Sequence, residues 1–336
     1  MNMNSRICSL ANGAVLQREC QRKSFPCCRQ QGVALVLVLW VIVLLTVIAG
    51  SMATSQRAAV SMVSNAKHER QGRALAAAGI QFMTLQLEQR SKPLSEQRYP
   101  ADGRLRPWQF ADHTVWIGAM SDTGRISLNM ANGELLAGML LAAGLDDMQV
   151  ENIRGAILDW RDKDSDHQIG GAEDDAYDAA GRPVGARDDV FQSVEELQQV
   201  LGVTPAIYKQ LAPRLTVHSM QRTVNPAYST AEVLASIPGI TPAEVEAYLA
   251  MRSQALDQGQ PVRMPEGPYA QYFSQSVGPV FRVFAEIDME SGSKVEAEVI
   301  INSGLKTTKG YKILERNYSP LINLGRTMAM AAEEAR

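Results

Sequence analysis

The sequence has few of the side chains that form disulfides or bind transition metals. Its 336 residues include four histidines and four cysteines, and the cysteines, Cys8, Cys20, Cys27 and Cys28, all precede Arg29. The long remainder of the chain therefore folds without disulfides. Thiolate and imidazole are the preferred ligands of zinc, so their scarcity argues against a transition-metal enzyme.

Motifs of common enzyme classes and an excess of positive charge are missing as well. The sequence contains neither the Gly-x-Ser-x-Gly motif of hydrolases nor a Walker A phosphate-binding loop. The formal net charge is −3, whereas nucleic-acid-binding domains are usually basic. We therefore predict a protein that is not an enzyme, that has no catalytic residues, and that does not bind nucleic acid.

Charge is also absent from one long apolar run, residues 33–53, which contains no Asp, Glu, Lys or Arg. A helix of this length spans roughly 30 Å, the thickness of the hydrocarbon core of a bilayer. The preceding residues 1–32 carry an excess of Lys and Arg over a single acid, Glu19. By the positive-inside rule, this bias keeps the N-terminus in the cytoplasm. The run is thus predicted to be a single transmembrane helix, with the rest of the chain on the far side of the membrane.

The basic segment and the apolar run meet at Gly32 and Val33. A basic leader that ends in Gly and precedes a retained apolar helix resembles the signal of type IV prepilin-like proteins. The resemblance implies that a prepilin peptidase of the bacterial inner membrane cleaves between Gly32 and Val33 and methylates Val33. Two alternatives are an uncleaved anchor and an ordinary signal peptide, whose cleavage site Ala49, Ser51 and Ala53 imitate.

Position 37 departs from the prepilin pattern. Most prepilin-like proteins carry Glu at the fifth mature position, which is Leu37 here. An acid in lipid is costly and is kept for a function; in this class it neutralises the N-terminal amine of a neighbouring subunit. Its loss resembles the K-type minor pseudopilins of the type II secretion system, which lie at the tip of the pseudopilus. The alternative is that Leu37 is one more lipid-facing residue.

Beyond the membrane, the sequence predicts a long helix followed by strands. Residues 56–89 are rich in helix formers and carry an amphipathic stripe, so one helix is expected from Val33 to about Gln89. A hairpin is expected from residues 114–120 and 125–129 around a turn at 122–124. Three further strands are expected at residues 280–289, 294–301 and 311–316.

Between the two groups of strands, residues 130–264 are expected to form helices and loops. The simplest arrangement is an α+β, pseudopilin-like fold: the long N-terminal helix packs on an antiparallel sheet, and a large α-helical domain is inserted. The predicted domains are a leader peptide (1–32), a transmembrane helix (33–53), the pseudopilin helix with the first strands (54–129), the inserted α-domain (130–264) and the C-terminal strands (265–336).

A weak repeat inside the helical region resembles helix-hairpin-helix, or SAM-like, units. Residues 193–204 and 230–241 each predict a helix that ends at a Gly, after which Thr-Pro begins the next helix. In DNA-binding hairpins such a turn grips a phosphate. Here acids flank both turns and oppose DNA binding, so the units are predicted to be structural. These acids are Glu195, Glu196, Glu244 and Glu246.

The segment 155–178 holds a dense group of acids. Four of them match positions 1, 3, 5 and 12 of an EF-hand loop, but His167 stands where an EF-hand has Gly, so the EF-hand fold itself is not expected. Closely spaced carboxylates repel one another without a cation and suit Ca²⁺, while the alternative is a solvated acidic loop. Asp188 lies outside the predicted site. The predicted calcium ligands are Asp162, Asp164, Asp166, Glu173, Asp174 and Asp175.

The acidic segment also carries the closest resemblance to the K-type minor pseudopilins. The resemblance implies a calcium-binding loop, I-type and J-type minor pseudopilins as partners, and a place at the pseudopilus tip, where the protein starts or caps assembly for export of folded proteins across the outer membrane. The matching motifs are Asp159-Trp160, Asp162-x-Asp164, Gly171-Ala-Glu-Asp174 and Tyr177 in the segment, and Leu128-Asn129 and Val224-Asn225 outside it.

Two functions of other classes stay open at this point. A membrane-anchored periplasmic enzyme would use the acidic loop as a metal centre. A DNA-uptake pilin-like protein would use the hairpins. The expected location is the bacterial inner membrane, which the chain crosses once, with its soluble part in the periplasm and at the pseudopilus tip after assembly.

Overall fold

The computed structural model describes residues 33–87, 98–289, 292, 294–304 and 310–317. The chain divides into two compact units, residues 1–62 and 63–336, and the boundary falls inside helix α1, Val33–Gln86. In the described part of the chain, one helix is long and apolar enough to cross a membrane; its apolar portion is Ala34–Met52, with a mean hydropathy of 2.8. The predicted long helix is therefore confirmed.

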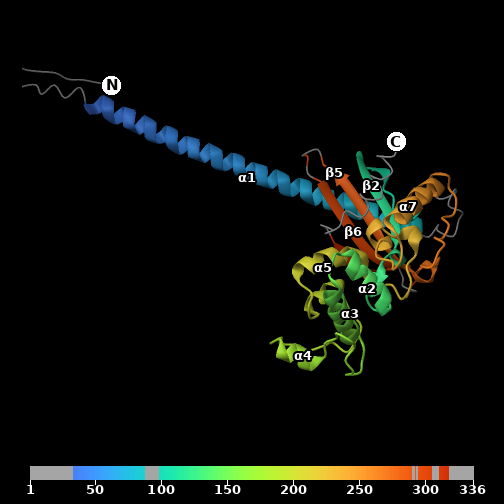
Figure 1. The fold of residues 1–336 in the computed structure, drawn as a ribbon. Helices are drawn as coiled ribbons and strands as arrows, with labels where there is room; N and C mark the ends of the chain where they lie inside the picture. Colours follow the sequence, from blue (N-terminus) through green and yellow to red (C-terminus); the bar gives the residue numbers. More distant parts are fainter. Residues whose placement is uncertain (1–32, 88–97, 290–291, 293, 305–309, 318–336) are drawn as a thin grey trace, which may run out of the picture. The chain divides into compact units, whose positions relative to one another are not determined.

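The second unit is built on a five-stranded antiparallel sheet in the order β1-β2-β5-β6-β7 (Figure 1). The second half of α1 packs on one face of this sheet. Gly79 allows the close approach, because a Cβ atom there would lie 2.8 Å from Ile117 and 2.9 Å from Val115. The strands are β1 (Arg106–Phe110), β2 (His113–Ser121), β5 (Val280–Asp288), β6 (Lys294–Asn302) and β7 (Lys312–Asn317).

The sheet confirms the predicted α+β fold and the three C-terminal strands, but the predicted hairpin is wrong. Strand β2 pairs with β1, which precedes it, across a turn at Ala111 and Asp112. Residues 122–124 form a 3-10 helix, and the next strand, β3 (Ile126–Ser127), leaves the sheet to pair in parallel with β4 (Leu215–Thr216). Asp122 is buried and bonded to side chains far away in sequence, so tertiary contacts override its turn propensity.

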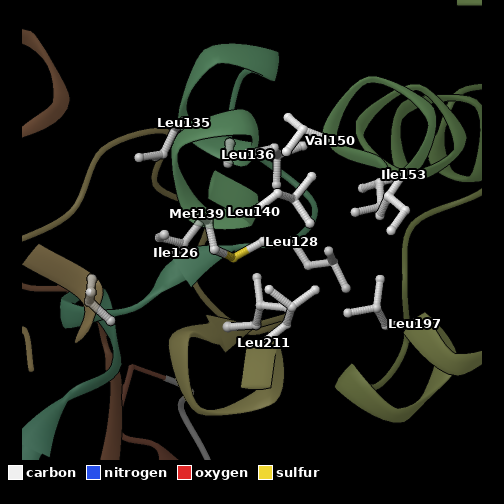
Figure 2. Packing of buried hydrophobic residues seen from close by; sticks show 14 of the residues in the cluster. Ile126, Leu128, Leu135, Leu136, Met139, Leu140, Val150, Ile153, Leu197 and Leu211 are labelled. Atoms are coloured by element: carbon white, nitrogen blue, oxygen red, sulfur yellow. The ribbon is translucent and has the colours of Figure 1, made fainter. Parts of the chain in front are cut away.

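Residues 122–279 lie in the chain between β2 and β5, which are neighbours in the sheet. Their helices pack around a second apolar core, in which side chains of α2 and α3 meet Leu128, Leu197 and Leu211 (Figure 2). The helices are α2 (Gly133–Ala142), α3 (Asp147–Arg161), α4 (Asp174–Ala179), α5 (Pro205–Leu211), α6 (Ala231–Leu234) and α7 (Pro242–Asp257).

Both repeat units contain the predicted glycine turn. Gly202 and Gly239 adopt the same left-handed φ of +84°, and Thr204 and Thr241 cap the helices that follow, each with Pro at its first position. The element before the first turn is a 3-10 helix, Val194–Gln199, rather than the expected α-helix. The two units are therefore similar in the turn and in the helix that follows it, and they differ in the element before the turn.

A buried charge network joins the sheet to the segment that follows β2. Arg282 on β5 donates from Nε to Asp122 Oδ1 at 2.6 Å and from Nη1 to Glu298 Oε1 on β6 at 3.0 Å. Thr216 on β4 donates its hydroxyl to the other oxygen of Asp122. All four residues are more than 90% buried. The network therefore links the sheet with the β3–β4 pair.

Candidate metal centre

The acidic loop connects α3 to α4, at the end of the helical region away from the sheet (Figure 1). Asp162 is the C-cap of α3 and Glu173 is the N-cap of α4. Helix α3 forms because Asp146 and Gln149 make a capping box and its apolar face, with Ile153 and Ile157, enters the second core. The packed helix thus fixes the position of the residue at which the loop begins, Asp162.

The loop folds back over α3 instead of projecting into solvent. A Cβ atom on Gly155 of α3 would lie 2.6 Å from the backbone nitrogen of Gly171, so the loop crosses the helix where the side chain is missing. Gln168 N–H donates to Asp159 Oδ1 at 3.1 Å. Asp159, in the last turn of the helix, thereby becomes fully buried beneath the loop.

Three acids of this region bury an oxygen that has no hydrogen-bond partner among the described residues. They are Asp159 with Oδ2, Asp162 with Oδ1 and Glu173 with Oε1. Buried polar atoms in proteins are nearly always bonded, so three such oxygens close together in the chain are an unusual feature of this region.

The electrostatics show that these acids, together with Asp188, act on one another. Burial, and next the charges of Asp159, Asp162 and Asp188, raise the pKa of Glu173 to about 7. Burial and the neighbouring carboxylates, Asp164 first, raise the pKa of Asp162. Burial also raises the pKa of Asp159. The raised pKa values mean that the charged form of each carboxyl group is destabilised here, and protonation or a nearby cation would relieve that cost.

The remaining predicted ligands lie at the surface and bond elsewhere. Asp164 Oδ1 accepts from the backbone N–H of Asp166 at 3.1 Å, and both residues are exposed. Asp174 Oδ1 accepts from Ala186 N–H at 3.0 Å, and Asp175 lies 3.3 Å from His167 Nε2. Of the six predicted acids, the structure thus brings Asp162 and Glu173 into the buried group and leaves the other four outside it.

Sequence spacing missed two acids that bear on the group: Asp159, which is buried in it, and Asp188, which is exposed and acts through its charge. Asp159 sits inside a helix and carries no loop signal, although it precedes the aromatic Trp160. Asp188 is far along the chain and has a left-handed φ of +55°, a strained geometry for a residue other than glycine. Its segment is held by Asn129, which exchanges two hydrogen bonds with the backbone of Phe191.

Trp160, Tyr177 and Phe191 form an aromatic cluster in the same region as the acids. The ring of Trp160 stacks near Phe191 at 6.0 Å and lies 5.7 Å from that of Tyr177. The hydroxyl of Tyr177 accepts from Leu201 N–H at 3.3 Å. The cluster ties the end of α3 to α4 and to the first repeat unit.

The arrangement suits an oxygen-binding cation more than a reaction. Within the described ranges, no three His, Cys, Asp or Glu side chains already converge tightly enough to hold a metal ion. The donors that do approach one another are carboxylates, which match Ca²⁺ and mismatch soft metals. The other predicted site, the cleavage junction, lies outside the described residues at Gly32, and Val33 is the first residue of α1.

Comparison with known proteins gives three consistent findings. A sequence profile described as "Type II secretion system (T2SS), protein K" matches residues 120–220, which include the acidic loop. The chain is 26% identical over 207 residues to the putative type II secretion system protein K of Escherichia coli K12, covering 56% of this chain and 62% of that protein. It is 25% identical over 236 residues to the type II secretion system protein K of Pseudomonas aeruginosa, covering 65% and 71%.

A third relative is the type II secretion system protein K of Dickeya chrysanthemi, 25% identical over 244 residues. That alignment covers 56% of this chain and 66% of the relative, so the matched region spans less than two thirds of the E. coli and Dickeya proteins. Among solved structures, the fold is similar to the crystal structure of the GspK-GspI-GspJ complex from the type 2 secretion system of enterotoxigenic E. coli, with a TM-score of 0.52 and 14% identity over 76% of this chain and 99% of that one. In the sequence of residues 120–220 and in its fold, the chain is thus similar to type II secretion system protein K, a K-type minor pseudopilin.

Proposed function

We propose that this protein is the minor pseudopilin that begins or caps the type II secretion pseudopilus at its tip. One observation carries the proposal: a helix long enough to span a membrane leads into a helix-backed sheet with a large helical segment between neighbouring strands. The similar solved chain comes from the crystal structure of a GspK-GspI-GspJ complex. We therefore propose the I-type and J-type minor pseudopilins as partners.

The helical segment favours the tip over the shaft. It holds six helices and its own apolar core, so it adds a second layer of mass to the pseudopilin sheet. A subunit stacked directly above would have to accommodate this bulk. Leu37 agrees with the same position, because a tip subunit has no predecessor whose terminal amine it must neutralise. No feature of the described residues favours the enzyme or DNA-uptake alternatives over this function.

Co-purification tests the partnership. The full chain, carrying an affinity tag and co-expressed with the I-type and J-type minor pseudopilins of the same bacterium, is expected to retain both in one complex after detergent extraction. The major pseudopilin, co-expressed in the same way, is the matched control and should not be retained to the same extent. Recovery of neither minor pseudopilin, from protein that still binds the column, contradicts the proposed function.

The membrane topology gives a separate prediction. We propose that a prepilin peptidase removes residues 1–32 and that the mature protein, anchored once in the inner membrane with its soluble part in the periplasm, begins at a methylated Val33. Intact-mass measurement of the protein from bacterial membranes should show a loss of residues 1–32 and the addition of one methyl group. An N-terminus near Ser51 would identify an ordinary signal peptide, and an unchanged mass would identify an uncleaved anchor.

We also propose that the acidic loop holds calcium. The residues fit the ion, because Asp159, Asp162 and Glu173 each bury a carboxylate oxygen that has no partner among the described residues, and Asp188 adds a fourth negative charge. The sequence placed Asp164, Asp166, Asp174 and Asp175 in the site as well; their exposure puts them at its edge. When bound, calcium supplies positive charge that lets the carboxylates pack together, so its role is structural.

A further inference from the structure

A histidine and a glutamate from distant parts of the chain meet at one edge of the sheet. His218 follows β4, and Glu315 lies on β7, 97 residues further along the chain. The ring nitrogen Nε2 of His218 is 2.6 Å from Oε1 of Glu315. The pair therefore connects the segment that leaves the β3–β4 ladder to the strand at the edge of the five-stranded sheet.

The backbone around His218 is held in place by buried groups. The N–H of His218 donates to the hydroxyl oxygen of Thr216 at 3.0 Å. Val217 and Ser219 on either side are buried, and the carbonyl of Ser219 accepts from the hydroxyl of Ser127 at 2.6 Å. The side chain of His218 is 17% exposed. The imidazole thus has a fixed position and enough contact with water to exchange a proton.

Strand β7, which carries the glutamate, is held much less firmly. It is an edge strand, and its ladder with β6 is irregular between Ile300 and Ile301. None of its six residues is buried: Leu314 is partly buried and the other five are exposed. A segment with so little buried surface opens readily. A single polar contact such as that of Glu315 therefore changes how often this strand opens.

The histidine is the member of the pair whose charge changes near neutral pH. The hydrogen bond from His218, and then the charges of His218 and Arg282, outweigh burial and hold the pKa of Glu315 below its ordinary value. Glu315 is therefore a carboxylate from about pH 5 to 8, the range in which histidine as a residue type loses its charge. The other charged or titratable groups near the pair are Asp122, Arg125, Arg282, Glu298 and Tyr208.

These neighbours keep their charge over the same range. Arg282 is paired with Asp122 and Glu298 in the buried network. Burial lowers the pKa of Arg125 to about 9 and raises the pKa of Tyr208, so Arg125 stays protonated and Tyr208 stays neutral. His218 and Glu315 are thus an ion pair at about pH 5, whereas at about pH 8 a carboxylate lies beside a neutral imidazole, which it binds more weakly.

We propose that His218 and Glu315 form a pH-sensitive latch, which fastens β7 to the segment after β4 at about pH 5 and loosens it at about pH 8. A histidine with an anionic partner stabilises the fold while the imidazole is protonated, and that contribution is lost as the pH rises through its titration. Opening of β7 makes β6 the edge strand and frees its main-chain groups, so the latch controls how accessible this edge is to another strand.

Hydrogen exchange of the full chain in lipid nanodiscs tests the latch. Mass spectrometry of peptides that cover residues 312–317 gives their exchange rates at about pH 5.5 and about pH 7.5, on either side of the ordinary histidine titration. Division by the intrinsic rate at each pH then gives the extent of opening. We expect the opening of β7 to increase about fivefold at the higher pH, because a charged hydrogen bond is stronger than a neutral one and Glu315 is only partly shielded from water.

Two variants and one control identify the contact responsible. His218→Gln and Glu315→Gln each remove one charge of the pair, so each should increase opening of β7 at the lower pH and abolish most of its pH dependence. The double variant should open no further than either single variant, because all three lose the same contact. Arg104→Gln is the matched control: Arg104 pairs with Asp257 of α7 and joins the segment before β1 to the helical region without a histidine, so β7 should keep its full pH dependence.

Protection of β5, at the centre of the sheet, shows whether each variant is folded. Equal opening of β7 at the two pH values in the unaltered protein would overturn the proposal. A pH dependence that persists in folded Glu315→Gln, whose substituted side chain is 44% exposed, would overturn it as well.

Discussion

Arg282→Met is expected to lower the free energy of unfolding by about 3 to 5 kcal/mol, the usual cost of removing one partner from a buried ion pair. Arg282 holds Asp122 and Glu298, which are 1% and 8% exposed. Methionine is similar in length but removes both charged hydrogen bonds, so only the charge of the buried Arg125 remains near the two carboxylates. Thr216 alone cannot replace two charged hydrogen bonds to the acids.

The measurement is urea unfolding of residues 63–336, the unit that contains both apolar cores, followed by circular dichroism. Arg73→Met is the matched control, because Arg73 pairs with Glu69 on the surface of α1 and both side chains are more than half exposed. An exposed pair contributes at most about 1 kcal/mol. Equal losses in the two variants would show that the buried network does not stabilise the fold.

The same network predicts a dependence on pH. Burial raises the pKa of Asp122, but Arg282, Arg125 and Thr216 outweigh it and hold that pKa below its ordinary value. A carboxyl with a lowered pKa stabilises the fold above its unfolded pKa, and the contribution is lost as the pH falls. The difference between the unaltered protein and Arg282→Met should therefore shrink as the pH is lowered from about 5 to 3.

Local sequence patterns were enough to predict the elements whose apolar residues follow a single helical or strand periodicity. The apolar run and the stripe that follows it gave α1, and the alternating segments near the C-terminus gave β5, β6 and β7. Strand β1 was missed because Pro107 lowers its strand propensity, and its turn at Ala111 and Asp112 is left-handed without a glycine.

Long-range pairing explains the other errors. Strand β3 is two residues long and its partner β4 lies far along the chain, so no local pattern indicates that it leaves the sheet. In the acidic loop, spacing predicted six ligands, but of these Asp162 and Glu173 bury an unpartnered carboxylate oxygen, whereas the alternating acids at positions 164 and 166 are exposed. That burial depends on the loop crossing α3 at Gly155, a tertiary contact.

Calcium is expected to raise the melting temperature of residues 63–336 by about 5 °C or more over the same protein in chelator. An ion that binds the folded state alone stabilises it by about 2.7 kcal/mol at a hundredfold excess over its dissociation constant. For a domain of this size each kcal/mol corresponds to about 2 °C or more. Calorimetry measures the shift, and the fluorescence of Trp160, which is 2% exposed and follows Asp159 in the chain, reports binding at the loop.

The substitutions distinguish the buried group of acids from the alternating ones. Asp159→Asn and Glu173→Gln keep the side-chain shape and remove the charge, so each should abolish most of the calcium-dependent shift. Asp178→Asn, an exposed acid on α4, should keep it in full. Asp164→Asn should weaken it only modestly, because that carboxylate is exposed and already accepts from Asp166 N–H. Magnesium should replace calcium poorly, since it requires a small octahedral cage and retains its waters. If the shift persists in Asp159→Asn but is lost in Asp164→Asn, the alternating acids bind the ion and the buried group does not. If calcium causes no shift even in the unaltered protein, the loop is an acidic surface without a bound ion.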